Sequence, residues 1–144
     1  MTFDRQGSGL TLIRIGLGVF FVFEGVGKLA WLINADALNG QLAGWLSGAL
    51  PLNRWYLERV AIPGAWAFAR LVVVGELGGG LALVLGFWTK LVAALVFLMV
   101  LNFHFASGAL FHYTFLANPY GLPVLGPLVG LAIGAVRLPL SLRK

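Results

Sequence analysis

Residues 10–33 read LTLIRIGLGVFFVFEGVGKLAWLI, an apolar stretch long enough to cross a lipid bilayer as a helix. Arg14 and Glu24 interrupt the apolar run, and no small-residue cleavage site follows it. These features are not those of a secretory signal peptide, which has an uninterrupted apolar region and is removed. We therefore expect this stretch to be retained as a first transmembrane helix.

The rest of the chain has the same apolar character. Of its 144 residues, 60% are hydrophobic and 10% are charged, whereas soluble domains average about 45–50% and about 25%. Three further stretches are long enough to span a membrane, namely 62–88, 91–109 and 120–136. The sequence therefore predicts an all-α membrane protein, a single domain over residues 1–144 folded as a four-transmembrane-helix bundle. A turn signal at residues 118–121 leaves a re-entrant segment as the alternative for the last stretch.

The segment 34–61, between the first two predicted helices, is too long to be a simple connector. Its apolar residues recur at helical spacing, which predicts an amphipathic helix lying in the membrane interface. This helix could cover the bundle with no further role, or act as a lid over a site. We expect an aromatic belt at the outer membrane surface, formed by Trp31, Trp45, Trp55, Tyr56 and Trp66.

Positive charges are unevenly distributed between the two faces of the predicted bundle. Arg54 and Arg59 fall on the face of the long loop. The opposite face has more cations, namely Arg5, Lys90, Arg137, Arg143 and Lys144. Because cytoplasmic loops carry the excess of Lys and Arg, we expect both termini in the cytoplasm and the long loop on the other side of the membrane. The net charge of +5 comes from scattered cations, so the expected partner is the lipid bilayer and not nucleic acid.

The chain has no cysteine. This excludes a disulfide framework, a Cys-ligated zinc or iron–sulfur site and a thiol nucleophile from this chain. The sequence also has no phosphate-binding loop, dinucleotide fingerprint, zinc-hydrolase motif or Ser/His/Asp arrangement. Any redox chemistry must therefore depend on a bound cofactor or on a partner protein.

Five ionisable side chains lie at predicted membrane depth: Arg14, Glu24 and Lys28 in the first helix, and Arg70 and Glu76 in the second. Each costs about 2.5–3.5 kcal/mol on insertion scales, so each needs a partner or a function. Matching their depths predicts that Glu24 pairs with Arg70, supported by Lys28, and that Arg14 pairs with Glu76. Two interpretations are open. The charges form a structural network that fixes helix register, or they form a proton relay or the polar part of a quinone pocket.

Asn102 and His104 add polar groups near the end of the third predicted helix. A histidine between two aromatic residues can hydrogen-bond a quinone carbonyl while the rings cover its plane. A satisfied interfacial histidine without a ligand is the alternative. Haem is not expected, because His112, the second histidine, follows the same helix instead of lying on a facing one. The candidate site therefore comprises Arg14, Glu24, Lys28, Arg70, Glu76, Asn102 and His104.

Glycines recur at a spacing of four in two of the predicted helices. Gly75 and Gly79 lie in the second helix, and Gly126, Gly130 and Gly134 lie in the fourth. Small residues at this spacing allow helix backbones to approach closely. We expect these glycines to pack within the bundle, with an oligomer contact as the alternative.

Four short motifs together resemble the DoxX family of small four-helix bacterial membrane proteins. They are RIGLGVF at 14–20, EGVGKL at 24–29, GELGGG at 75–80 and GFWTKL at 86–91. The family includes relatives of the DoxD subunit of thiosulfate:quinone oxidoreductase, and the resemblance covers the first three helices. Its recurring charged positions correspond here to Arg14, Lys28 and Glu76.

The resemblance implies an integral plasma-membrane subunit of a redox complex that interacts with quinone. Quinone would be its cofactor, and the partners would be redox or sulfurtransferase-type proteins or a second copy of the chain. The alternative is a non-catalytic anchor or assembly subunit of an oxidoreductase or respiratory complex, with purely structural ion pairs. A small transporter is disfavoured because no inverted repeat is apparent.

Overall fold

The computed structural model describes residues 5–135 and 138–142, which contain helices and turns but no extended strands. Four elements are short 3₁₀ or π-helical segments. In chain order the elements are α1 (Arg5–Gly27), η1 (Leu29–Leu32), α2 (Asp36–Leu46), α3 (Pro51–Tyr56), η2 (Leu57–Ala61), α4 (Ala65–Leu85), α5 (Thr89–Ala106), η3 (Ala109–Phe111), η4 (Tyr113–Ala117) and α6 (Leu122–Gly134).

Three helices, α1, α4 and α5, are long and apolar enough to cross a membrane among the described residues, and they match the first three predicted spans. The fourth, α6, has 13 residues, or about 20 Å of helix, against a hydrocarbon core of about 30 Å. Its last predicted residue, Val136, lies outside the described residues. Pro123 lies in the first turn of α6 as expected, whereas Pro127 lies inside the helix and removes one backbone donor there.

The ends of α1 and α4 differ from the predicted bounds. α1 ends at Gly27, not Ile33, because the chain tightens into the 3₁₀ segment η1 after Lys28. α4 starts at Ala65, since a π-helical segment and a Pro-Gly turn precede it. It ends at Leu85, and the following Gly86 has φ of 69°, the left-handed conformation that glycine favours just past a helix C-terminus.

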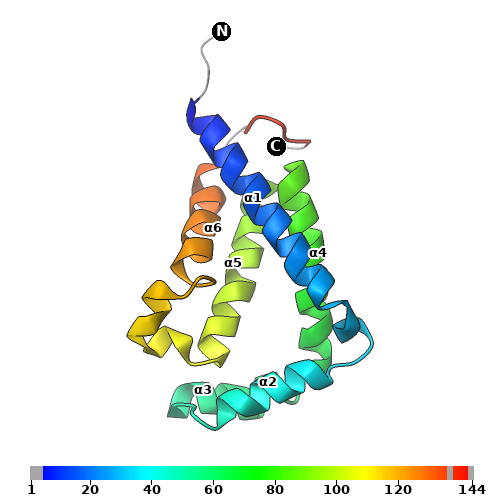
Figure 1. The fold of residues 1–144 in the computed structure, drawn as a ribbon, viewed down its shortest axis with the longest axis vertical. Coiled ribbons are helices and arrows are strands. Elements are labelled where there is room, and N and C mark those ends of the chain that lie inside the picture. The colour runs from blue at the N-terminus through cyan, green and yellow to red at the C-terminus, as the bar shows by residue number, and fades with distance from the viewer. Residues whose placement is uncertain (1–4, 136–137, 143–144) are drawn as a thin grey trace.

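The segment between α1 and α4 forms two helices in place of the single predicted one. Pro51 starts α3, because its ring presets the first helical turn and needs no backbone donor there. In Figure 1, α2 and α3 lie across one end of the bundle, and the start of α1 lies at the opposite end. The C-terminal segment also lies at that opposite end, where Leu142 N donates a hydrogen bond to Leu85 O at the end of α4.

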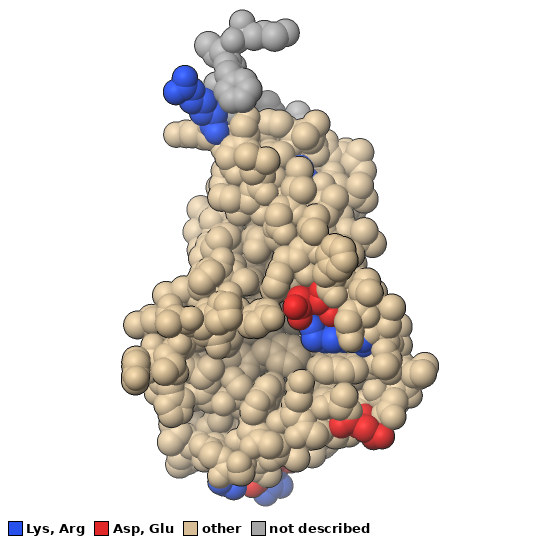
Figure 2. All heavy atoms as spheres, in the orientation of Figure 1, with Lys and Arg blue, Asp and Glu red and all other residues tan. Residues whose placement is uncertain are grey.

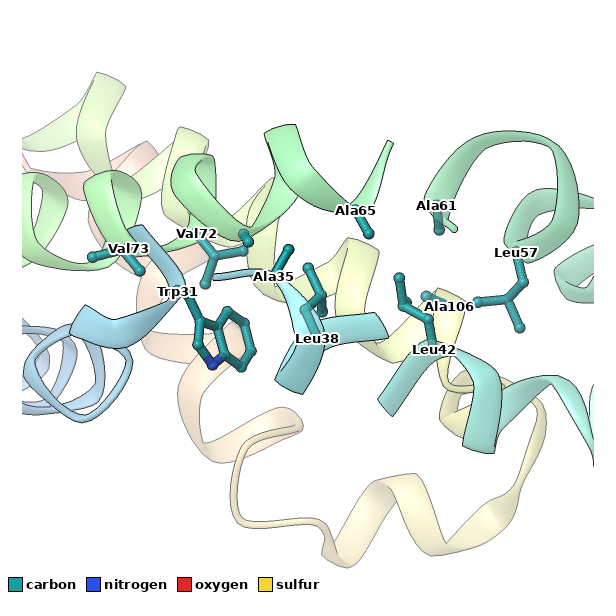
Figure 3. Close-up of a cluster of buried hydrophobic side chains, with 11 residues drawn as sticks. Trp31, Ala35, Leu38, Leu42, Leu57, Ala61, Ala65, Val72, Val73 and Ala106 are labelled. Atoms are coloured by element: carbon teal, nitrogen blue, oxygen red, sulfur yellow. The ribbon is translucent and has the colours of Figure 1, made fainter. Parts of the chain in front are cut away.

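α2 is amphipathic, as predicted, and packs its apolar face onto α4. Leu38 and Leu42 are buried in one cluster with Ala61 of η2 and Ala65 of α4 (Figure 3). Trp31 of η1 belongs to the same cluster. The small alanine side chains let α2 lie close to the α4 backbone, so α2 covers the first half of α4.

α1 crosses α4 at a point where two glycines meet. A Cβ added to Gly80 would lie 2.7 Å from Val22 N and 2.8 Å from Gly18 O, both backbone atoms. Backbone atoms cannot move aside as the end of a flexible side chain can. The crossing therefore requires glycine at position 80. The position of this crossing decides which residues at the end of α1 lie against α4.

Gly80→Ala is expected to lower the free energy of unfolding by about 1–3 kcal/mol, because the added methyl group overpacks the helix crossing. Gly78→Ala is the matched control in the same glycine run, since a Cβ there meets no atom within 4 Å. That variant should be neutral or slightly stabilising. The thermal stability of both variants can be measured by the change in intrinsic tryptophan fluorescence on heating in mild detergent. Equal unfolding midpoints for Gly80→Ala and Gly78→Ala would contradict a close backbone contact at Gly80.

The glycines of α4 and α6 differ in their surroundings. Cβ atoms added at Gly75 and Gly79 would lie 2.8 Å from Met99 and 2.7 Å from Val96, so these residues pack on α5 as predicted. A Cβ added at Gly126 or Gly130 would meet no atom within 4 Å. The predicted packing through these two glycines is wrong, because α6 rests on α5 through its apolar face, including Leu128 and Leu131. Gly134 does lie against the bundle, since an added Cβ would be 3.7 Å from Leu10.

Candidate functional site

A cavity of about 210 Å³ lies between α1, α2, α4, α5 and the start of α6. Figure 2 shows the hollow opening on the side of the bundle, with acidic and basic side chains at its margin. Three charged residues share this cavity with mostly apolar and aromatic ones. The lining residues are Phe20, Phe21, Glu24, Lys28, Trp31, Gln41, Trp45, Glu76, Val100, Phe103, His104, Tyr120 and Val124.

Lys28 joins two glutamates at the cavity wall. Its Nζ lies 2.8 Å from Glu24 Oε2 and 2.9 Å from both carboxylate oxygens of Glu76. Glu24 and Lys28 are one helical turn apart, and the crossing of α1 over α4 brings Glu76 to the same point. We call Glu24, Lys28 and Glu76 the carboxylate–lysine triad; with all three ionised it carries one net negative charge.

The members of the triad differ in exposure. The Glu76 side chain is 9% exposed, whereas those of Lys28 and Glu24 are 22% and 32% exposed. Glu76 is thus the inner carboxylate and Glu24 the outer one. Charged hydrogen bonds in a site of low dielectric constant are stronger than those in water, so the triad has a well-defined geometry.

The predicted pairs Glu24 with Arg70 and Arg14 with Glu76 are wrong, while the predicted contact of Lys28 with Glu24 is present. Arg70 donates from Nη1 to Trp66 O at 2.7 Å, and its guanidinium carbon lies 3.6 Å from the centre of the Trp66 ring. Six residues separate Arg70 from Glu76, which places them about 120° apart around α4. Only Glu76 can therefore face Lys28.

Arg14 is fully buried and binds backbone carbonyls at the opposite end of α4. Its Nη1 donates to the carbonyl oxygens of Leu83 and Val84, at 2.9 and 3.3 Å. Its Nη2 donates to those of Pro139 and Leu140, at 3.4 and 2.9 Å. The last carbonyls of a helix lack partners within the helix and favour a nearby cation. Arg14 thus caps the C-terminal end of α4 and binds the C-terminal segment. It lies about 15 Å from Glu24 along α1.

His104 contributes to the cavity from α5. It is 7% exposed, and its Nε2 lies 2.8 Å from Tyr120 O. A carbonyl oxygen only accepts hydrogen bonds, so Nε2 carries the proton in this contact. In the neutral ring, Nδ1 is then an acceptor, and no hydrogen bond to it is found within the described residues. The ring also packs edge-on against Phe115 at 5.1 Å between centroids.

The other polar residues predicted near the end of α5 lie outside this cavity. Asn102 Oδ1 accepts a 2.6 Å hydrogen bond from Tyr56 OH. Asn102 lines a second cavity of about 20 Å³, which shares Trp45 and Phe103 with the larger one. A cavity of this size holds about one water molecule. His112 is exposed in the turn between η3 and η4.

Sequence reasoning missed most of the aromatic wall, since it expected only the rings beside His104, of which Phe103 lines the cavity. Trp31 was expected in an outer belt but is 7% exposed and lines the cavity with Trp45, whereas Trp55 and Trp66 are exposed. Phe20 could have been found from the sequence, since it precedes Glu24 by one helical turn on the same face. Tyr120 could not, because only the fold brings it near α1.

The cavity residues fall largely within a recognised family domain. The family model for DoxX matches residues 9–112, more than half of the chain. The chain belongs to the DoxX family. The matched part of this DoxX chain contains the carboxylate–lysine triad and His104, whereas Tyr120 and α6 lie beyond it. No curated protein and no solved structure matches the chain.

Proposed function

We propose that this DoxX-family membrane protein is a subunit of a redox complex and binds the ring of a quinone in the side-opening cavity. The observation that carries the proposal is the carboxylate–lysine triad set in an otherwise apolar, aromatic cavity. A quinone has the matching character, with polar oxygens on a flat apolar ring. Ligand sites usually combine an apolar lining with a few placed polar groups.

The size and direction of the cavity support a lipid-borne ligand. Its volume of about 210 Å³ is below the range of about 300–1,000 Å³ usual for drug-sized ligands. It therefore suits a single ring but not a long isoprenoid tail. The opening on the side of the bundle (Figure 2) would let such a tail remain among the lipid chains, because the long helices run across the bilayer.

The triad also suits the chemistry of a quinone, which takes up two protons and two electrons when it is reduced. Glu24 and Glu76 can carry protons where water is scarce. No cysteine is present to exchange electrons, so the electrons would come from a redox or sulfurtransferase-type partner protein. We place the protein in a bacterial inner membrane, with both termini cytoplasmic and α2 and α3 at the outer surface.

Quinone should co-purify with the protein extracted in mild detergent from its native membrane, at close to one per chain. Val124→Phe fills the cavity and is expected to lower the quinone content by about tenfold, since a phenyl ring occupies the ligand's space. Val129→Phe is the matched control, because Val129 lies on the exposed face of the same helix. Solvent extraction followed by chromatography measures the content. Folded preparations that never contain quinone would overturn the proposal.

An anchor or assembly role is the second candidate, and Arg14 favours it. All of its hydrogen bonds within the described residues go to backbone carbonyls, so they join parts of the chain to one another and involve no ligand. Glu76→Gln separates the two roles, since an amide oxygen can still accept a hydrogen bond from Lys28. We expect a complex that assembles normally but reduces quinone at least about tenfold more slowly, as loss of one proton carrier predicts. Loss of the protein from the membrane would instead indicate a structural ion pair.

A further inference from the structure

The donor capacity of Lys28 is already taken up within the triad. Its ammonium group has three N–H donors, and they are directed at carboxylate oxygens of Glu24 and Glu76. Glu24 Oε1, in contrast, receives no hydrogen bond from any described residue, and the Glu24 side chain lines the cavity. The triad therefore presents a ligand with a free charged acceptor and not with a free ammonium donor.

His104 presents a second acceptor to the same cavity. Its Nε2–H is held by Tyr120 O, which leaves Nδ1 of the neutral ring as the free nitrogen. The side chain is more than nine-tenths buried and is part of the cavity wall. No hydrogen bond to Nδ1 is found within the described residues, so a ligand that donates to it gains a hydrogen bond that an acceptor ligand cannot make.

The remaining polar groups of the wall do not distinguish the two forms of a quinone. Trp31, Trp45 and Tyr120 carry N–H or O–H donors, and Gln41 carries both a donor and an acceptor. A carbonyl oxygen accepts from such donors, and a hydroxyl oxygen can also accept from them while its hydrogen remains available. Only acceptors therefore discriminate, because a hydroxyl can donate to them and a carbonyl cannot.

We infer that the cavity binds the reduced, hydroxyl-bearing quinol more tightly than the oxidised quinone, with Glu24 and His104 as the selecting acceptors. This inference rests on the proposed function and adds the redox form that the site favours. A charge-assisted hydrogen bond to Glu24 is enough for a preference of at least about tenfold. For a two-electron couple, tenfold tighter binding of the quinol raises the midpoint potential of the bound quinone by about 30 mV. The bound quinone would then be easier to reduce than quinone in the bilayer.

Anaerobic calorimetry on the full chain in quinone-free lipid nanodiscs tests the inference with three probes. They are duroquinone, durohydroquinone and the dimethyl ether of durohydroquinone, which keeps the ring and both oxygens but has no donor. We expect durohydroquinone to bind at least about tenfold more tightly than either of the others. A redox titration of the bound couple should show the matching rise of about 30 mV.

Glu24→Gln should reduce the preference to less than about threefold, because an amide can donate to a carbonyl as well as accept from a hydroxyl. Glu58→Gln is the matched control, since Glu58 is exposed beside Arg54 and does not line the cavity. Equal binding of quinone and quinol would overturn this inference while leaving the proposed function in place. A preference that survives in Glu24→Gln would overturn the role of Glu24. Failure of all three probes to bind would overturn the proposed function itself.

Discussion

Arg14→Met is expected to lower the free energy of unfolding by more than about 3 kcal/mol. The substitution leaves the carbonyl oxygens at the end of α4 and in the C-terminal segment without their donor, in a place where Arg14 is fully buried. Each hydrogen bond to a charged group contributes about 1.5–3 kcal/mol. Thermal unfolding followed by far-UV circular dichroism in mild detergent measures the loss, together with recovery of monodisperse protein on size exclusion.

Two further variants control this prediction. Arg14→Lys keeps the charge but lacks the planar fork that reaches carbonyls on two segments, so it should recover only part of the stability. Arg70→Met removes the arginine of α4, which binds one carbonyl and stacks on the Trp66 ring. That change should alter the free energy of unfolding by less than about 1 kcal/mol. Similar losses of unfolding free energy in Arg14→Met and Arg70→Met would show that Arg14 does not stabilise the protein by capping α4.

Lys28→Met is expected to lower the free energy of unfolding by about 3–5 kcal/mol, because it leaves two carboxylates side by side without their cation. Of the two carboxylates, Glu76 contributes more to this loss of stability than Glu24, because its side chain is only 9% exposed and both of its oxygens bind Lys28. The double variant Lys28→Met/Glu76→Gln should recover part of this loss, since it removes the unpaired inner charge. A double-mutant cycle on urea or dodecyl sulfate unfolding gives the coupling free energy. Additive losses, with no coupling, would contradict the triad as an interacting unit.

The long helices and the family could be predicted from local sequence alone. Three spans were found because apolar length decides whether a helix crosses a bilayer, and the short motifs around Arg14 and Glu76 were enough to indicate the DoxX family. The covering helix α2 was also predicted, since Leu38 and Leu42 lie at helical spacing. Such features depend on residues that are near one another in the chain, and helix geometry alone decides which of these residues share a face.

The partners of the buried charges could not be predicted in the same way. Depth matching gave Arg14 and Arg70 carboxylate partners, but Arg14 binds carbonyls and Arg70 stacks on Trp66. Depth fixes only one coordinate of a side chain in a bundle. The rotation of each helix about its axis and the angle at which helices cross decide which groups meet, and both depend on packing at Gly18 and Gly80.

The sequence by itself determined that this chain is a helical membrane protein, which residues are charged at membrane depth, and which family it belongs to. Only the tertiary structure decided that Lys28 joins Glu24 to Glu76 and that aromatic side chains from α1, η1, α2, α5 and the turn before α6 form one cavity around them. The physical reason is range. Hydrophobicity and helical periodicity act within a segment, whereas a site shared by five helices depends on how separate segments pack against one another.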